Sequence, residues 1–380
     1  MFNEIFKNRE LYYQSTFEED VDGAVYCGFD GTAKSLQIGN LLALSALRLA
    51  SKSGKKIIAL IGGATTEIGD PSGKNETRKV LERTQIESNF ENITKQIKKL
   101  IPEAEIVNNK DWISKLSFMD FLEKAAKYIP VGALIKLETF AKRLENNDPF
   151  NTQELLYPLV QGYDFLHLFE EKNCTMQLGG SDQWSNILTG ADLIKRKHGS
   201  KKAKGLTFEL LTNSQGVKLG KSVNGAIWID PNECSIFDFW QYWRNISDDL
   251  LIPCLKKLTL VEIDELERFL ENPNEGKILL ANEITSWVHS HEDAKAAEKK
   301  AKSIFLENNL NEAIEIKAES DSILEFLVST KTAKSNSEAK KLIEQGSIKV
   351  NQKTIEDKQY KIKANDIVQI GKKKFFKVNF

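Results

Sequence analysis

The chain has 380 residues, of which 41% are hydrophobic, and its 53 basic and 54 acidic side chains nearly cancel. A chain of this length and composition can bury a sizeable core and divides into two or three domains, so a disordered protein is excluded. No segment is apolar over the length that a bilayer requires, and the first residues lack the apolar core of a signal peptide. We therefore expect a cytoplasmic protein with no membrane segment.

The charge is unevenly distributed along the chain. Residues 331–380 carry 13 lysines and five acidic residues, a net charge of +8, which leaves about −9 on the rest. The four cysteines, at positions 27, 174, 234 and 254, have neither the spacing of a metal site nor that of a disulfide framework. We expect free thiols in a reducing compartment, and a basic C-terminal module on an acidic body.

Short β-type segments alternate with longer amphipathic segments through the first half of the chain. Strands are predicted at Val25–Phe29, Ile57–Ile61, Glu105–Val107 and Thr175–Leu178. This alternation predicts an α/β domain in which helices cover both faces of a parallel sheet. From about residue 231 to residue 315 the pattern is helical and highly charged, which predicts a separate helical domain.

The stretch from Asn308 to Ser322 is polar and is predicted to be a linker. Beyond it the pattern predicts two short helices, the second beginning with a Ser335-x-x-Glu338 capping box and ending at Gly346. Short β-type segments follow, so the last part of the chain is predicted to be a small domain with both helices and strands.

The stretch from Tyr26 to Leu44 has the outline of a strand that leads into a helix. Its apolar residues recur at helical spacing, and Ser35 is the expected N-cap, so the helix is predicted to begin at Leu36 or nearby. Such a helix N-terminus favours an anion at the carboxyl end of the strand. Three glycines would let a phosphate or an adenine ring approach the backbone: Gly28, Gly31 and Gly39. An ordinary strand-to-helix turn explains these glycines at least as well.

Two further glycine-rich segments carry positive charge. In the segment 62–79, Asp70 could meet an amine, while Lys74 and Arg78 share a helical face and could hold a phosphate chain. In the segment 216–222, Lys218 and Lys221 flank a glycine. Neither segment satisfies the Walker A pattern. Solvated lysines are the simplest interpretation of the second pair, but three phosphate-suited loops together favour a nucleotide with several phosphates.

The segment 157–186 is rich in groups that recognise small polar ligands. Tyr157, Gln161 and Asp164 fall on one helical face, and Gln177 begins a polar run after a strand. Such a polar helix face rarely packs into a hydrophobic core, because each buried polar group needs a hydrogen-bond partner. A bound amino acid would supply those partners. No Ser/His/Asp or Cys/His set predicts a covalent nucleophile, and the four histidines lie apart from these segments.

The basic C-terminal region has a positive face suited to phosphates. Lys340 and Lys341 lie on its second predicted helix, Lys334 lies just before that helix, and Lys372–Lys374 lie in a predicted hairpin. This face predicts an RNA partner, whereas a lysine-rich surface without RNA is the simpler alternative. The lysine-rich run 195–204 is most simply a solvated loop, with nucleic-acid contact as the minority interpretation.

Taken together, these segments resemble the class I aminoacyl-tRNA synthetases, and specifically the bacterial-type tyrosyl-tRNA synthetases, over essentially the whole chain. The resemblance rests on motifs in the order of that family: YCGFDGTAKSLQIGN in place of the HIGH region, GDPSGK, NNKDW, YPLVQGYDF, QLGGSDQW, and KLGKS in place of the KMSKS loop. It implies a Rossmann-like parallel-sheet catalytic domain over 1–230, a helical anticodon-side domain over 231–315, and a linker with an RNA-binding domain similar to that of ribosomal protein S-four over 316–380.

The resemblance implies a tyrosine–tRNA ligase, which makes tyrosyl-adenylate and pyrophosphate from tyrosine and ATP and then transfers the tyrosyl group to the 3' end of tRNA(Tyr). ATP is expected as a co-substrate with Mg²⁺ bound to it, without a tightly bound cofactor. The family also implies a homodimer, with the contact at about residues 109–146.

The resemblance also assigns residues to each ligand. Tyr26 and Asp164 would hold the tyrosine hydroxyl. The amine and carboxylate of tyrosine would meet Asp70, Tyr157, Gln161 and Gln177. ATP would meet Asp30, Gly39, Asn40, Gly180, Asp182, Gln183 and Ser222, of which Asp30, Gly180, Asp182 and Gln183 would contact the adenosine and the forming adenylate. The phosphates would meet Thr32, Gln37, Lys74, Arg78, Lys218 and Lys221. The tRNA would meet Lys334, Lys340 and Lys341.

The chain departs from the family pattern at its HIGH region. Gln37 and Asn40 replace two histidines, and Gly31 replaces the usual proline. Gln37 can donate to a phosphate oxygen but cannot become cationic. We predict an active enzyme. The effect expected from the replaced histidines is slower activation of tyrosine. A synthetase-derived RNA-binding protein with weakened catalysis is the alternative, and a tryptophanyl enzyme is disfavoured because Tyr26 and Asp164 suit a phenol better than an indole.

Overall fold

The computed structural model describes residues 2–71, 82–199, 202–212, 219–222, 225–305, 314–351, 353–371 and 374–380, with only the backbone described at 221, 222, 225, 304, 305 and 374. The chain forms two compact units, residues 1–291 and 292–380. No described helix is long and apolar enough to cross a membrane.

The first unit is built on a six-stranded sheet in the order β1-β6-β5-β2-β3-β4. All neighbours are parallel except β1 and β6. The strands are β1 (Gln14–Ser15), β2 (Ala24–Asp30), β3 (Ile57–Gly62), β4 (Glu105–Asn108), β5 (Cys174–Gly180) and β6 (Lys204–Phe208). The four predicted strands are therefore confirmed, and β1 and β6 are additional.

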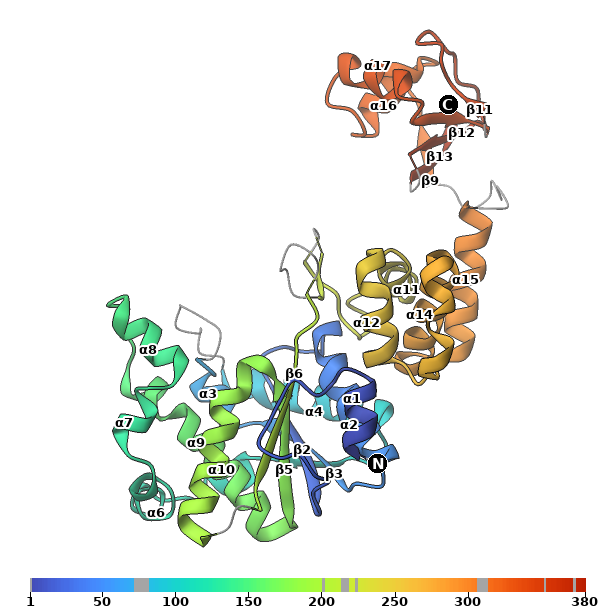
Figure 1. Cartoon of the computed structure of the whole chain (residues 1–380). Coiled ribbons are helices and arrows are strands. Elements are labelled where there is room, and N and C mark those ends of the chain that lie inside the picture. Colours follow the sequence, from blue (N-terminus) through green and yellow to red (C-terminus); the bar gives the residue numbers. More distant parts are fainter. Residues whose placement is uncertain are drawn as a thin grey trace. The chain divides into compact units, whose positions relative to one another are not determined.

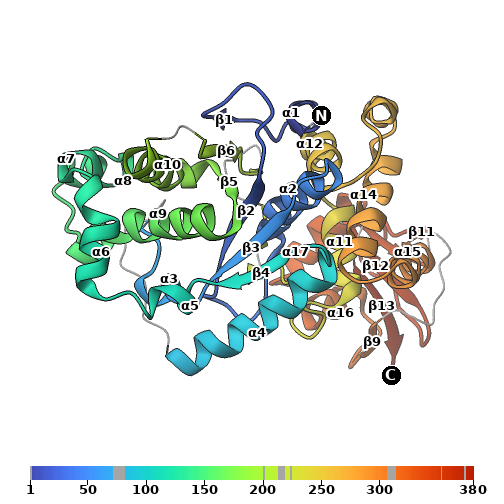
Figure 2. The same cartoon turned by 90° about the horizontal axis from the view of Figure 1, so that it is seen from below.

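Helices cover both faces of this sheet, so the predicted α/β class is confirmed (Figure 2). One face carries α9 (Thr152–Lys172) and α10 (Trp184–His198), and the other carries α2 (Leu41–Lys52) and α4 (Arg83–Leu100). Shorter elements complete this part: α1 (Phe2–Asn8), η1 (Ile38–Asn40), α3 (Thr65–Ile68), η3 (Ser181–Gln183), β7 (Lys221–Ser222) and β8 (Gly225–Ala226).

The helices α9 and α10 cross at two glycines. A Cβ atom added at Gly162 would lie 3.2 Å from the Cα atom of Gly190, and one added at Gly190 would lie 3.1 Å from the Phe165 ring. The two backbones are therefore in direct contact, and a side chain at the crossing would require its neighbours to shift by a few tenths of an ångström.

The predicted start of α2 is wrong. The 3₁₀ turn η1 begins at Ile38 and α2 begins at Leu41, so Ser35 is not an N-cap. Instead, the Ser35 hydroxyl donates to Leu36 O at 2.9 Å and accepts from Gln96 Nε2 at 3.0 Å. The hydroxyl is thus engaged by a distant side chain on α4.

The segment after β4 forms short helices at the end of the unit next to α9 (Figure 2). They are α5 (Lys110–Ile113), α6 (Phe118–Lys124), η2 (Ala126–Tyr128), α7 (Val131–Leu134) and α8 (Glu138–Glu145). Several of their apolar side chains are exposed, namely Phe118, Met119, Val131 and Leu144. This insertion therefore presents apolar surface that the rest of the unit does not cover.

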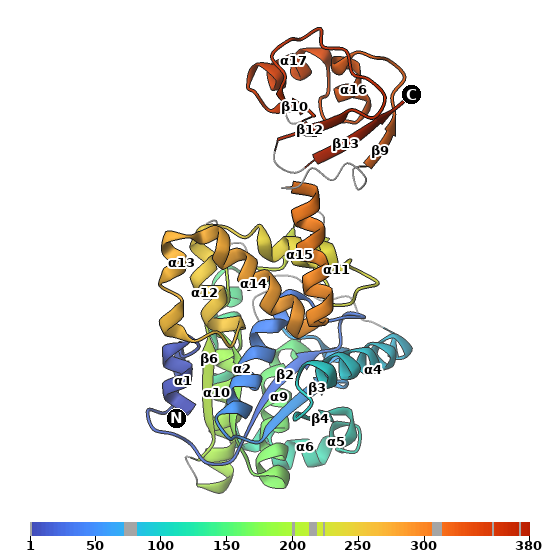
Figure 3. The same ribbon diagram turned by 90° about the vertical axis from the view of Figure 1, so that its right-hand side faces the viewer.

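The end of the first unit is helical, as predicted (Figure 3). It contains α11 (Ile236–Arg244), α12 (Asp248–Leu258), η4 (Ile263–Glu265), α13 (Arg268–Glu271) and α14 (Pro273–Val288). Helix α14 packs against α11, α12 and α13, and α12 also contacts α2. The domain boundary predicted at residues 230 and 231 stays a prediction.

The second unit consists of α15, whose first residue belongs to the first unit, and a small α+β domain (Figure 1). Its five-stranded sheet has the order β11-β10-β12-β13-β9. The elements are α15 (His291–Phe305), β9 (Ile314–Lys317), α16 (Ile323–Ser329), α17 (Asn336–Glu344), β10 (Ile348–Val350), β11 (Lys353–Thr354), β12 (Ile367–Ile370) and β13 (Lys374–Asn379). The two predicted helices are confirmed, and Ser335 Oγ accepts from Glu338 N at 3.3 Å as their predicted cap requires.

The predicted linker is partly wrong, because β9 lies inside it. β9 pairs in parallel with β13, and residues from Ile314 onward therefore belong to the folded domain. The part of the predicted linker before Ile314 lies outside the described residues.

Candidate active site

A cavity of about 220 Å³ opens where β2 and β5 end. The chain runs from β2 outward to β3 and β4 and then returns to β5 on the other side of β2, so this is the point where the strand order reverses. Open α/β sheets bind ligands at such points. Twelve of the predicted site residues line the cavity: Tyr26, Asp30, Gly39, Asn40, Asp70, Tyr157, Gln161, Asp164, Gln177, Gly180, Asp182 and Gln183.

Two buried polar side chains on this cavity come from β2 and α9. The Tyr26 hydroxyl has no hydrogen-bond partner among the described residues. Asp164 is 2% exposed, and its carboxylate accepts from Asn109 Nδ2 at 2.9 Å and from Trp112 Nε1 at 2.8 Å. Burial raises the pKa of the Asp164 carboxyl to about 7, although both donated hydrogen bonds act to lower it. Burial, followed by the Asp164 charge, raises the pKa of the Tyr26 phenol well above its usual value.

Asn109 and Trp112 fix the Asp164 carboxylate from outside the cavity. Asn109 Nδ2 also donates to Thr65 Oγ1 at 2.9 Å, and Asn109 Oδ1 accepts from Ala64 N at 2.8 Å. Hydrogen bonds at both the nitrogen and the oxygen therefore fix the orientation of this amide. The Trp112 ring stacks on His167 with ring centroids 4.4 Å apart. The sequence motif NNKDW contains both residues, but their spacing alone did not reveal this role.

A network of side-chain amides lines one wall. Gln183 Nε2 donates to Asp70 Oδ2 at 2.8 Å, and Gln161 Nε2 donates to Gln183 Oε1 at 3.2 Å. Asn186 Nδ2 donates to Gln161 Oε1 at 3.0 Å, which orients that amide from behind. Gln177 Oε1 is buried and has no partner among the described residues. The wall therefore offers one carboxylate and several oriented amides to a ligand that carries both a positive and a negative group.

The edge next to η1 is shaped by the residues that depart from the family pattern. Asn40 Oδ1 accepts from Gln37 N at 2.9 Å, which closes the turn. Gly31 N donates to Thr66 Oγ1 at 2.9 Å, and Gly31 O accepts from Asn89 Nδ2 at 2.7 Å. A proline at position 31 would lack the N–H group that Thr66 accepts here.

Some residues predicted for the phosphates do not line the cavity. Thr32 is exposed and Gln37 is half-buried, and neither contributes to the cavity wall. Lys74, Arg78 and Lys218 lie outside the described residues. Of Lys221 and Ser222 the backbone alone is described, in β7. The phosphate assignments therefore stay predictions.

Several cavity residues were not predicted from the sequence. Phe208 and Leu210 come from the unpredicted strand β6 and its end, and Thr65 comes from α3. Cys27 also contributes, but burial raises the pKa of its thiol to about 12, so it is no thiolate nucleophile. Among the residues that the structure describes, no group of three His, Cys, Asp or Glu side chains could hold a metal ion.

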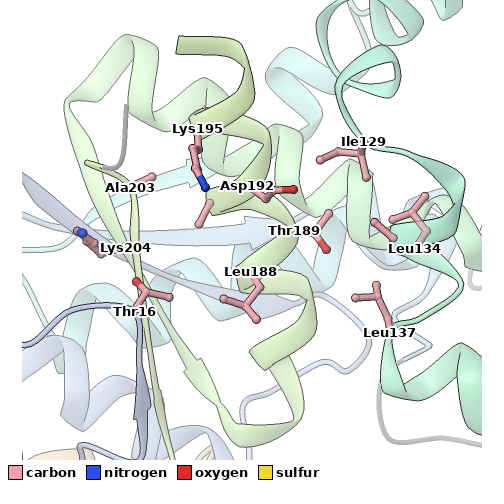
Figure 4. Close-up of a pocket in the computed structure, with 12 residues that line it drawn as sticks. Thr16, Ile129, Leu134, Leu137, Leu188, Thr189, Asp192, Lys195, Ala203 and Lys204 are labelled. Atoms are coloured by element: carbon pink, nitrogen blue, oxygen red, sulfur yellow. The ribbon is translucent and has the colours of Figure 1, made fainter. Parts of the chain in front are cut away.

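A second cavity, of about 470 Å³, lies between the insertion and α10. Figure 4 shows Ile129, Leu134 and Leu137 of the insertion across from Leu188 and Thr189 of α10. None of the predicted site residues lines it, and its lining is mostly aliphatic. This cavity lacks the convergent polar groups of the first.

Three of the lysines predicted to meet RNA, Lys334, Lys340 and Lys341, are exposed. Lys340 and Lys341 lie on α17, and Lys334 precedes the Ser335 cap. Lys372 and Lys373 lie outside the described residues, as does the side chain of Lys374.

Comparison with known proteins identifies similar chains over both units. Residues 19–306 match the family model described as tRNA synthetases class I (W and Y), and residues 307–378 match that of the tyrosine–tRNA ligase SYY-like C-terminal domain. The chain is 38% identical to the tyrosine–tRNA ligase of Pelagibacter ubique, covering 98% of both chains. It is 39% identical to that of Clostridium botulinum strain Loch Maree, covering 99% of this chain and 98% of the relative. A C-terminally truncated mitochondrial tyrosyl-tRNA synthetase from Aspergillus nidulans has a similar structure, with a TM-score of 0.73 and 26% identity over 80% of this chain and 94% of that one.

Proposed function

Since the chain belongs to the class I tRNA synthetases of the tryptophan and tyrosine type, and functions as a tyrosine–tRNA ligase, we propose how its residues divide the work of that reaction. Tyrosine lies in the 220 Å³ cavity with its phenol hydroxyl between Tyr26 and Asp164. The observation that carries this proposal is the buried Tyr26 hydroxyl, which lacks a partner among the described residues and lines the same cavity as the Asp164 carboxylate.

A substrate phenol supplies the partner that the Tyr26 hydroxyl lacks and a third donor for the Asp164 carboxylate. Its O–H donates to the Asp164 carboxylate, and its oxygen accepts from the Tyr26 hydroxyl. Phenylalanine would fill the same volume but leave the Tyr26 hydroxyl unpaired, at a cost of roughly 1–3 kcal/mol, and would give the Asp164 carboxylate no donor beyond Asn109 and Trp112. An indole has one N–H donor and no acceptor, so tryptophan would leave Tyr26 unpaired.

The remaining predicted residues are assigned by the charge of each ligand group. Asp70 meets the tyrosine ammonium group, together with Tyr157 and Gln161, while Gln177 orients the backbone end of the amino acid. ATP binds next to η1, with adenosine near Asp30, Gly39, Gly180, Asp182 and Gln183. The Asn40 oxygen is engaged in the turn, so its Nδ2 group is the one that donates to a ribose or phosphate oxygen.

We assign the phosphates to Thr32, Gln37, Lys74, Arg78, Lys218, Lys221 and Ser222. ATP arrives with Mg²⁺ on its phosphates, the usual binding mode of that ion at nucleotide sites. A tyrosine carboxylate oxygen attacks the α-phosphorus, and the bond to the bridging oxygen of pyrophosphate breaks. In the second step the 3'-terminal hydroxyl of tRNA attacks the tyrosyl carbonyl carbon and AMP leaves. Positioning and charge stabilisation therefore do most of the work, without a covalent nucleophile.

The test is ATP–pyrophosphate exchange with each of the twenty amino acids. Exchange with tyrosine alone supports the assignment, and a double Lys218→Ala, Lys221→Ala variant is the control for background. Exchange with tyrosine no faster than in that variant would instead support the synthetase-derived RNA-binding protein. The retained tyrosine cavity disfavours this alternative, because a pure RNA binder has no use for it.

We also propose a homodimer formed through the insertion. Phe118, Met119 and Val131 are 71%, 69% and 65% exposed, which is an unusual number of exposed large apolar side chains for one short segment of the chain. The proposed contact region is 109–146, as the sequence predicts. A Phe118→Asp, Val131→Asp variant should sediment as a monomer while the unmodified chain sediments as a dimer, and two dimeric proteins would contradict this interface.

We propose that the last domain, which begins at Ile314 and not at residue 316, binds tRNA through Lys334, Lys340 and Lys341. We also propose that the helical region from residue 231 onward is the anticodon-side domain and that the enzyme is cytoplasmic. Cys27, Cys174 and Cys254 are buried free thiols, which suits a reducing compartment.

A further inference from the structure

The backbone next to Lys221 is held by an unbroken series of hydrogen bonds. Gly220 N donates to the Tyr242 hydroxyl at 3.1 Å, and Gly220 O accepts from Ile227 N at 3.1 Å. Ile227 O in turn accepts from Ile38 N at 3.1 Å. This series joins α11, the Lys221 segment and the turn η1.

The Lys221 segment and η1 also touch backbone to backbone. Gly220 has φ +102°, which favours glycine, and a Cβ atom there would lie 3.4 Å from Gly39 N. A Cβ atom on Gly39 would lie 3.7 Å from Leu219 O. Since no side chain separates them, a displacement of Gly220 changes the distance between the two segments directly.

Tyr242 fixes one end of this series from a rigid element. Its ring meets the Trp243 ring edge-on, with centroids 5.3 Å apart, and Trp243 is fully buried in the helical region. α11 packs along α14, so the phenol oxygen has a defined position. Tyr242 itself does not line the tyrosine cavity.

We propose that Tyr242 is a positioning residue for tyrosine activation, which sets the place of Lys221 relative to the turn η1 by accepting the Gly220 N–H. The inference rests on the proposed function, in which Lys221 meets the phosphates of ATP. Without the acceptor, Gly220 samples other positions, and Lys221 is correctly placed in a smaller fraction of molecules. The effect falls on the activation rate, because neither Tyr242 nor Gly220 lines the tyrosine cavity.

The test is Tyr242→Phe, which removes the hydroxyl group and keeps the ring. We expect kcat for tyrosine-dependent pyrophosphate exchange to fall about five- to tenfold, the usual effect of losing one such hydrogen bond, with KM for tyrosine unchanged. The double variant Tyr242→Phe, Lys221→Ala should be no slower than Lys221→Ala alone, because Tyr242 acts through the lysine.

The matched control is Tyr12→Phe, which removes another phenol hydroxyl that is hydrogen-bonded to the backbone. The Tyr12 hydroxyl donates to Phe17 O, and Tyr12 does not line the cavity. It should leave kcat unchanged. An equal loss in the control, unchanged kcat in Tyr242→Phe, or additive losses in the double variant would each overturn the inference while the proposed function stands. If Lys221→Ala itself leaves exchange unchanged, the phosphate assignment of this segment fails and the inference fails with it.

Discussion

Tyr26 and Asp164 are the residues on which substrate choice depends. They differ in the hydrogen-bond partners that the free protein gives them. Asp164 has two protein donors, whereas the Tyr26 hydroxyl is buried without a partner among the described residues. Substituting Tyr26→Phe should lower kcat/KM for tyrosine about 5- to 10-fold, the effect of one lost hydrogen bond. The ligand-free variant should melt no lower than the unmodified protein, since the removed group was unsatisfied. A drop in melting temperature would reveal a structural partner for this hydroxyl.

The ionisation of Asp164 predicts a pH dependence of tyrosine binding. With the pKa of this carboxyl raised to about 7, the free protein holds a neutral acid below that pH and a carboxylate above it. Because the substrate phenol donates to the carboxylate, kcat/KM for tyrosine should rise through pH 7 and then level off. The profile of Asp164→Asn should lack this rise and stay low throughout, whereas Asp120→Asn, which does not alter the cavity wall, should keep it.

The Asp164 carboxyl also makes the stability of the folded protein depend on pH, and the sign of this dependence follows from its raised pKa. The unfolded chain releases this proton near pH 3.8, whereas the folded chain keeps it until about pH 7. Between these values the folded state binds more protons, so the contribution of Asp164 to stability falls as pH rises.

The sequence predicted most of the cavity because its residues follow simple periodic rules. The helical spacing of Tyr157, Gln161 and Asp164 is sufficient to place them on one face of α9. The roles of Asn109 and Trp112 could not be derived in this way, since they act through contacts across 55 and 52 residues. The use of Gly31 N–H by Thr66 depends equally on tertiary structure.

At the scale of elements, the junction of α8 and α9 depends on one buried ion pair. The side chains of Arg143 and Glu154 are 6% and 10% exposed and meet at 2.9 Å, and Glu154 also accepts from Asn151 N at the start of α9. Arg143→Ala leaves a buried carboxylate unpaired and should destabilise the protein by about 3–5 kcal/mol. The matched control is Lys142→Ala, which loses an exposed pair with Glu138 and should leave the denaturation midpoint nearly unchanged. Equal midpoints in the two variants would show that the buried pair does not anchor α9.

Helices and strands were predicted where their own sequence pattern is strong. They were missed where pairing with a distant strand determines the structure. β6 is a five-residue strand after a lysine-rich run, and its place depends on its parallel pairing with β5. β9 has mostly exposed side chains, so its partner β13 rather than its hydrophobicity makes it a strand. Ser35 has the residue type of an N-cap, but the hydrogen bond from Gln96 is invisible to any local rule.

At the scale of the whole molecule, positive charge is concentrated in the part that we assign to RNA. Deleting residues 306–380 should abolish tRNA charging and leave tyrosyl-adenylate formation largely intact, because no described residue of the tyrosine cavity lies there. A cut at residue 320 is less suitable, since it would leave β9 without β13. Aminoacylation and pyrophosphate exchange measured side by side are the test, and a truncated chain that still charges tRNA would contradict the assignment.

The glycine crossing of α9 and α10 has a consequence for protein engineering. Because Gly162 and Gly190 bring the two backbones together, a single added methyl group would require neighbouring atoms to shift by a few tenths of an ångström, and α9 carries Tyr157, Gln161 and Asp164. Recognition of unnatural phenols is therefore adjustable from a position that never meets the ligand. Libraries restricted to the cavity wall would overlook that route to an expanded substrate range.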